Sequence, residues 1–375
     1  KHTKCPKFNK KAVRETDTFD TFFESSWYFA RFTDLNPVSA FNEEAIKYWM
    51  PVDQYIGGVE HAVMHLLYSR FFMRALKHVK SVDIEEPFTS LQTQGMVCHQ
   101  TFKTMDDKWV FPSDIVKNGN KFSHFETKEP LIAGRIEKMS KSKKNVVDPQ
   151  QIIDDFGADT ARFFVLSDSP PNRDMEWSVS GLEGSWRFLN KLWKFVISLP
   201  NKNNQNKLPT VISLQNKELL SVMHSTIKNV TKAIEEFHFN IAVAQIRNLF
   251  NVVFSHKIEN DDDAQVVLFV ISRLLVLINP MVPHIAEELW CSLGNQTSIS
   301  NESWPKVDLG YIKKSNVKIP VQVNGKVRAV VEVPINLNNK DIEEIALKEE
   351  NVLKFLNKSP KKVIIIPNRV VNFVI

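Results

Sequence analysis

The sequence contains little cysteine and no long uninterrupted apolar run. Its three cysteines (Cys5, Cys98 and Cys291) are far apart in a chain of 375 residues, so they cannot form a disulfide framework and indicate a reducing compartment. The most apolar stretch, 266–278, is interrupted by Arg273 and is too short to span a bilayer. These absences exclude a disulfide-stapled secreted module and a membrane-spanning helix in this stretch.

The composition is that of an ordinary globular protein. Apolar residues make up 43% and charged residues 24%, which excludes wholesale disorder and fibrous repeats. The length predicts two or three domains, and the net charge is +5. Because the chain starts at Lys1 rather than at Met, we expect a processed product, an expressed fragment or part of a longer polypeptide.

The first half of the sequence alternates between strand and helix patterns. Residues 1–16 are polar and basic and predict a loosely structured start, and an aromatic-rich segment follows. Residues 52–56 predict a strand that ends at Gly57-Gly58, and the apolar spacing of 59–77 predicts a helix. Strand, glycine pair and helix are the local order of an α/β nucleotide-binding sheet.

A second strand is expected over 91–98, whereas 100–135 shows little periodicity and is interpreted as an insertion. A lysine-rich loop at 138–144 precedes Asp148-Pro149, an N-cap and first-turn pair that predicts a helix over 150–166.

The second half changes from helix to a mixed pattern. Residues 182–304 have the periodicity of an antiparallel helix bundle, interrupted by a linker at 200–210 and an acidic loop at 259–263. Alternating segments on both sides of Asn324-Gly325 predict a β-hairpin. A helix over 340–357 and strands over 363–366 and 370–375 complete a small predicted α+β module.

The lysine loop is the strongest chemical motif. Lysine ammonium groups flanked by small hydroxyl residues suit a loop that closes over a polyphosphate and stabilises a leaving pyrophosphate. An arbitrary run of this kind is more often a solvated surface loop. The loop reads Lys138-Met139-Ser140-Lys141-Ser142 and is followed by Asn-Val-Val-Asp-Pro at 145–149 and Gly-Ala-Asp-Thr-Ala-Arg at 157–162.

This context resembles the KMSKS signature of class I aminoacyl-tRNA synthetases, and further segments resemble the leucyl-tRNA synthetase family of bacterial type. The similar segments, in family order, are 17–29, 55–68, 94–96, 280–290 and 321–328. The resemblance implies an α/β, all-α and small α+β architecture: the C-terminal half of a Rossmann-like core with the KMSKS loop (1–180), an anticodon-binding-type helix bundle (181–310) and a tRNA-contacting domain (311–375).

The same resemblance implies an ATP-dependent ligase that joins leucine to tRNA(Leu) through leucyl-adenylate, with ATP and Mg²⁺ as substrate and no tightly bound cofactor. Lys138 and Lys141 are the expected catalytic residues, on the phosphates and the departing pyrophosphate. The expected ATP-binding set is Lys138, Met139, Ser140, Lys141, Ser142, Gly57, Gly58, Glu60 and Gln94. Simple turn glycines, a solvated first-turn glutamate at 60 and a structural amide at 94 remain alternatives.

The resemblance implies a leucine pocket formed by Phe23, Ser26, Phe29, Tyr55, His61 and His65. The two histidines are four residues apart and would share a helix face, a spacing that can also bind zinc. The HExxH order and a third ligand are lacking, and Phe8 stands where some relatives have a second cysteine after Cys5, so no metal site is expected.

The expected RNA-contacting end is the C-terminal module. Residues 317–375 hold ten Lys or Arg against six Asp or Glu, a net charge of +4. A basic surface suits contact with the backbone of a folded RNA. Lys326 and Arg328, beside the hairpin turn, are the candidate tRNA contacts.

The HIGH motif and the editing domain of the family are not found in these residues. We therefore expect the C-terminal portion of an enzyme that is monomeric when complete, inactive without its N-terminal half, and cytoplasmic or, in a eukaryote, organellar. The alternatives are an isoleucyl- or valyl-tRNA synthetase, a non-catalytic tRNA-binding fragment and a subunit of a split synthetase.

Overall fold

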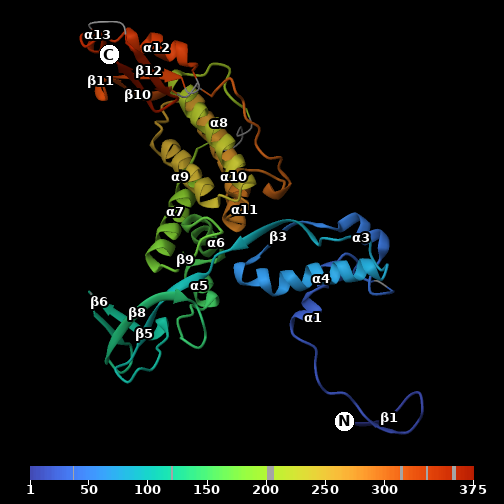
Figure 1. Cartoon of the computed structure of the whole chain (residues 1–375). Helices are drawn as coiled ribbons and strands as arrows, with labels where there is room; N and C mark the ends of the chain where they lie inside the picture. Colours follow the sequence, from blue (N-terminus) through green and yellow to red (C-terminus); the bar gives the residue numbers. More distant parts are fainter. Residues whose placement is uncertain (37, 120, 201–206, 313–315, 335–336, 357–359) are drawn as a thin grey trace. The chain divides into compact units, whose positions relative to one another are not determined.

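The computed structural model describes the chain apart from residues 37, 120, 201–206, 313–315, 335–336 and 357–359 (Figure 1). The chain divides into two compact units, which are described separately. The first contains 1–192, 233–244 and 281–285, and the second contains 193–232, 245–280 and 286–375. The predicted division into three domains is a different partition and stays a prediction.

The chain begins with a small hairpin. Strands β1 (His2–Lys4) and β2 (Lys11–Val13) pair antiparallel, so the expectation of a loose start was wrong. The aromatic segment forms the short helices α1 (Phe22–Ser25) and α2 (Tyr28–Arg31). Helix α3 (Glu43–Trp49) follows, and the Asn42 side chain caps it by accepting the first free backbone N–H groups.

A strand–helix–strand unit carries the glycine pair. Strands β3 (Val52–Gly58) and β4 (Phe88–Gln94) are parallel, and α4 (His65–His78) connects them. The glycine pair ends β3 instead of following it. The predicted helix over 59–77 is interrupted: a 3-10 turn, η1 (Val59–Val63), stops at Met64, whose φ of −120° and ψ of −103° are not helical.

The region interpreted as an insertion is a sheet. Strands β5 (Val97–Lys103), β6 (Ile115–Asn118), β7 (Lys121–His124), β8 (Pro130–Lys138) and β9 (Met175–Glu176) form one sheet in the order β6-β7-β8-β5-β9. A 3-10 turn, η2 (Pro112–Asp114), precedes β6.

The strand predicted over 91–98 is divided between β4 and β5, because the chain crosses another segment at Gly95. A Cβ atom there would lie 2.2 Å from the backbone of Arg173.

Glycine also divides the helix that follows the lysine loop. Asp148 caps α5 (Pro149–Phe156) by accepting the Gln150 N–H, as predicted. Gly157 then takes a φ of +85°, which ends α5 and begins α6 (Ala158–Asp168). The predicted single helix over 150–166 is therefore two helices.

The predicted helical region is confirmed. It contains α7 (Val179–Ser198), α8 (Leu214–Glu235), α9 (Phe239–Ser255), α10 (Asp261–Ile278), α11 (Pro283–Ser292) and the 3-10 turn η4 (Ile299–Asn301). Most of α10 is buried, which explains the apolar stretch in the sequence. None of the described helices is both long enough and apolar enough to cross a membrane. Part of the predicted linker, 201–206, lies outside the described residues.

The C-terminal module has a four-stranded sheet. Strands β10 (Asn316–Val323), β11 (Lys326–Pro334), β12 (Lys362–Ile366) and β13 (Val370–Val374) lie in the order β11-β10-β13-β12. Asn324 and Gly325 have φ values of +49° and +77°, the turn that their sequence predicted. The helix predicted over 340–357 is divided into α12 (Asn339–Leu347) and α13 (Glu350–Leu353), and its end lies outside the described residues.

Candidate functional site

Three segments far apart in the sequence meet at the carboxyl ends of β3 and β4. Gly58 and Gln94 are register partners at this edge, and Glu60 follows directly in η1. The Nζ of Lys138, the last residue of β8, lies 3.3 Å from Oε1 of Glu60. In open α/β sheets the carboxyl edge of the strands is the usual ligand-binding position. The structure thus brings four of the predicted ATP-binding residues to one edge.

The Glu60 carboxylate is held in a folded-back position. Its pKa is lowered, first by a hydrogen bond from its own backbone N–H and then by Lys138. A Cβ atom on Gly58 would lie 2.3 Å from Oε2, so the absence of a side chain there makes room for the carboxylate. Oε2 is buried without a hydrogen-bond partner among the described residues. An ionised carboxylate with an unused oxygen is suited to accepting hydroxyl donors.

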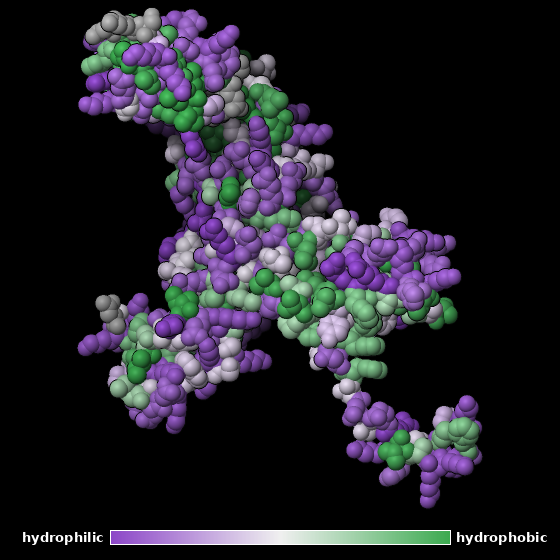
Figure 2. All heavy atoms as spheres, in the orientation of Figure 1, coloured by the Kyte–Doolittle hydropathy of each residue, from purple (hydrophilic) through white to green (hydrophobic). Residues whose placement is uncertain are grey.

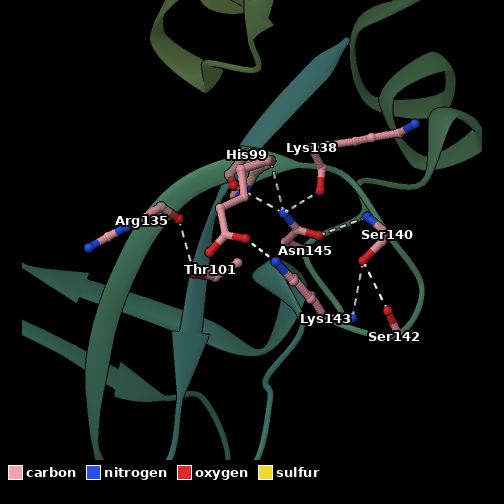
Figure 3. A network of polar contacts seen from close by, with 9 residues as sticks. His99, Thr101, Arg135, Lys138, Ser140, Ser142, Lys143 and Asn145 are labelled. Carbon is pink, nitrogen blue, oxygen red and sulfur yellow. Dashed lines mark hydrogen bonds and ion pairs between the residues drawn. The ribbon is translucent and has the colours of Figure 1, made fainter. Parts of the chain in front are cut away.

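Asn145 anchors the lysine loop (Figure 3). This buried side chain donates from Nδ2 to the carbonyl oxygens of His99, Glu137 and Lys138, at 3.1, 3.2 and 3.3 Å. Its Oδ1 accepts the Ser140 N–H at 2.9 Å. One amide therefore fixes both ends of the turn against β5 and β8, and the sequence analysis did not single it out.

The remaining loop residues divide between internal contacts and solvent. Ser140 and Ser142 hydroxyls are 3.2 Å apart, and Ser140 Oγ accepts the Lys143 N–H. Lys143 pairs with Glu137. Lys141 is exposed, and Figure 3 shows the Lys138 side chain extending away from the Asn145 network. Lys138 and Lys141 thus contribute backbone carbonyl oxygens to the loop's hydrogen bonds, while the Lys138 ammonium group pairs with Glu60 and the Lys141 side chain is exposed.

A neutral hydrogen-bonded chain lies beside β3. Tyr55 Oη is 2.7 Å from Tyr28 Oη and 2.6 Å from His65 Nε2. Burial and the Tyr28 hydrogen bond raise the pKa of Tyr55, while burial and the nearby His61 lower the pKa of His65. Both side chains therefore stay uncharged near neutral pH. An uncharged surface of this kind can lie against an aliphatic side chain such as that of leucine.

The other predicted leucine-pocket residues are placed differently. Phe29 belongs to a core cluster with Met73, and its ring makes a T-shaped contact with the ring of Phe88. The buried Ser26 hydroxyl donates a hydrogen bond to the backbone carbonyl of Phe22. Phe23 stacks on Phe19, with ring centroids 4.4 Å apart.

The two histidine rings, 6.3 Å apart, come from η1 and α4. The expectation of one shared helix face was therefore wrong, because the helix breaks at Met64.

Two cavities border the strand ends. Gln94 and Arg173 line a cavity of about 210 Å³. Met139 lines a second, mostly apolar cavity of about 540 Å³ together with Val97 and Trp177. Met139, the second residue of the lysine motif, therefore faces hydrophobic surroundings, while Lys138 pairs with Glu60 and Lys141 is exposed.

The predicted tRNA contacts lie in the other unit. Lys326 is exposed at the start of β11, and the Arg328 guanidinium lies against the Phe355 ring. No group of three or more His, Cys, Asp or Glu side chains placed to hold a metal ion occurs in the described part of the chain.

Comparisons with known proteins agree with this geometry. The family "tRNA synthetases class I (I, L, M and V)" matches residues 122–178, and the family "Anticodon-binding domain of tRNA ligase" matches 216–345. The lysine loop lies inside the first of these matches. Both matches are to families of tRNA ligases, and the chain is similar in sequence and fold to class I tRNA synthetases.

Curated relatives of the chain are leucine–tRNA ligases. Leucine–tRNA ligases of Paramagnetospirillum magneticum and Rickettsia bellii are 47% and 45% identical over 100% of this chain, which covers 44% of each. The chain is a homologue of leucine–tRNA ligases along its whole length and spans about 44% of the length of these relatives. The isoleucyl and valyl alternatives are not favoured.

A solved structure supports the same grouping. The leucyl-tRNA synthetase of Agrobacterium radiobacter K84, determined in a ternary complex with tRNA and LeuAMS, has a TM-score of 0.75 and 29% identity. The match covers 100% of this chain and 44% of that chain. The shared fold is a mixed α/β fold with many helices and several small sheets.

Proposed function

We propose that this chain supplies the KMSKS portion of the adenylation site of a leucine–tRNA ligase, together with its tRNA-binding regions. In this proposal β3, α4 and β4 form part of a Rossmann-like core, 181–310 is the anticodon-binding-type bundle and 311–375 contacts tRNA. The chain acts with the N-terminal portion of a complete, monomeric enzyme. The scarcity of cysteine supports a cytoplasmic location.

The reaction has two steps. The leucine carboxylate attacks the α-phosphate of ATP, forming leucyl-adenylate and releasing pyrophosphate, and a hydroxyl at the 3′ end of tRNA(Leu) then takes the leucyl group. Because the substrate carries its own nucleophile, the protein contributes position and charge. ATP enters with Mg²⁺ as part of the substrate.

Each residue at the site has a role in this scheme. The Lys138 and Lys141 ammonium groups stabilise the negative charge that builds up on pyrophosphate. The free Glu60 oxygen accepts the ribose hydroxyls, where Gly57 and Gly58 let the substrate approach the backbone. Gln94 forms a hydrogen bond with the nucleotide near its adenine or ribose. Tyr55, His65 and His61 form the neutral wall of the leucine side-chain pocket.

One observation carries the proposal: the ion pair between Lys138 and Glu60 at the carboxyl edge of β3 and β4. This ion pair places the expected phosphate-binding residue, Lys138, next to the expected ribose acceptor, Glu60. One nucleotide can therefore reach both residues. A solvated basic loop would need no such partner.

The test uses a complete enzyme in which this chain replaces the matching 44% of the Paramagnetospirillum magneticum relative. Leucine-dependent ATP–pyrophosphate exchange should occur, and Glu60→Gln should raise the KM for ATP. Glu85→Gln, which alters an exposed glutamate near the end of α4, is the matched control. Equal effects of the two substitutions would contradict the role of Glu60.

A further inference from the structure

A β-bulge sets Arg328 apart from its neighbours on β11. In the β10–β11 pairing, Val321 is opposite Ala329 and Gln322 is opposite Val327, so Arg328 is an extra residue with no partner. Bulges of this kind change the direction of a side chain at a sheet edge, and β11 is an edge strand.

The redirected side chain packs on an exposed aromatic ring. The guanidinium carbon of Arg328 lies 3.6 Å from the ring centroid of Phe355, and this ring remains 42% exposed. Phe355 follows α13, which packs against β10 and β11. The two residues therefore meet through the fold of the module rather than through sequence proximity.

The guanidinium is not neutralised. No carboxylate pairs with Arg328 among the described residues, and its Nε is buried there without a hydrogen-bond partner. Lys326, on the same strand, is exposed. With one face of the guanidinium on the ring and Nε covered, the two terminal nitrogens remain as a planar fork of N–H donors, which matches two oxygens of a phosphate.

We propose that Phe355 is a positioning residue that holds Arg328 ready to bind an RNA phosphate. The inference rests on the proposed tRNA-binding function. A free arginine side chain loses rotamer entropy when it binds, and stacking on Phe355 reduces that loss because the side chain is already ordered. Phosphate is favoured over a nucleobase because the two terminal nitrogens offer paired N–H donors at the edge of the guanidinium, and these fit two phosphate oxygens.

The experiment measures binding of the 375-residue chain to a tRNA(Leu) transcript over a series of KCl concentrations. Arg328→Ala should weaken binding and lower the salt slope by about 1. Phe355→Leu, which keeps apolar bulk, should weaken binding about fivefold, and Phe355→Tyr should restore it. Leu353→Ala, on the neighbouring exposed apolar residue of α13, should have no effect.

A double-mutant cycle separates positioning from a general structural role. In the Arg328→Ala background, Phe355→Leu should cause no further loss. Equal losses in both backgrounds, or unchanged binding by Phe355→Leu, would overturn the inference while leaving tRNA binding intact. Absence of any tRNA binding by the unaltered chain would instead overturn the tRNA-binding function and this inference with it.

Discussion

Lys138 and Glu60 form an ion pair 3.3 Å long although 78 residues separate them in the sequence. One partner ends β8 at the start of the lysine loop, and the other follows β3 at the carboxyl edge of a parallel strand pair. The pair holds the first loop lysine over the expected nucleotide position. An arriving ATP would exchange this internal contact for contacts of each residue with phosphate or ribose.

Two adjacent glycines offer a matched test of the Glu60 position. Gly58→Ala should raise the KM for ATP about tenfold or more in the complete enzyme, because the new Cβ atom displaces the Glu60 carboxylate. Gly57→Ala should raise the KM less, because no protein atom lies within 4 Å of a Cβ there and the Glu60 carboxylate is not displaced. Steady-state exchange kinetics would check both, and equal KM values would count against the folded-back carboxylate as a ribose acceptor.

Lys141, the exposed lysine of the loop, should contribute to adenylate formation rather than to tRNA binding. Lys141→Ala should lower adenylate formation by about a hundredfold or more, because a charge that stabilises the leaving pyrophosphate is lost. Affinity for tRNA should change little. Single-turnover adenylation and filter binding would be compared, with Lys117→Ala on the exposed end of β6 as the control. Similar losses in both assays would contradict the assigned role.

The buried amide at the base of the loop should matter for both folding and activity. Asn145→Ala removes four hydrogen bonds to the backbone and should lower the free energy of unfolding by about 2–4 kcal/mol. Asn145→Asp has a similar shape but loses the Nδ2 donors, so it should also loosen the loop and slow adenylation. Urea denaturation and exchange kinetics measure these effects. Wild-type values for both variants would show that the loop is held by other contacts.

Acid should weaken the Tyr55–His65 region. Because the pKa of folded His65 lies below its ordinary value near 6.5, the unfolded chain takes up a proton first as the pH falls. The stability that neutral His65 contributes is therefore present above pH 6.5 and is lost as the pH falls toward the folded pKa. Unfolding at pH 7.5 and 5.5 should show a larger acid-induced loss for the wild type than for His65→Asn. A larger acid-induced loss of stability for His65→Asn than for the wild type would contradict a lowered pKa of His65.

Local signals predicted local structure well. The Asn324-Gly325 turn and the Asp148-Pro149 helix start depend on backbone preferences of neighbouring residues, and both are confirmed. The breaks at Met64 and Gly157 were missed, because apolar spacing continued across them.

Contacts between distant segments were beyond the sequence patterns. Strand β8 is mostly exposed, so its residues lack the alternation that reveals a strand, and the sheet it joins was interpreted as an insertion. Asn145 looks like any loop asparagine until β5 and β8 surround it. The lysine motif was recognised, but its pairing with Glu60 required the structure.

Figure 2 shows hydrophobic side chains gathered on the visible face of the segment that contains β3 and α4. Leu67 and Phe71 are large apolar residues of α4 that are 57% and 65% exposed. We expect the N-terminal portion of the complete enzyme to cover this face. The isolated chain should accordingly have a half-formed site.

Leucine-dependent ATP–pyrophosphate exchange is the most direct test of the central claim. It should be measured on the isolated chain and on the complete enzyme at equal concentration, with leucine, isoleucine or valine. We predict no exchange by the isolated chain, and exchange by the complete enzyme that leucine supports far better than the other two amino acids. Exchange by the isolated chain, or a preference for isoleucine or valine in the complete enzyme, would contradict the claim that this chain supplies one part of a leucine-specific adenylation site.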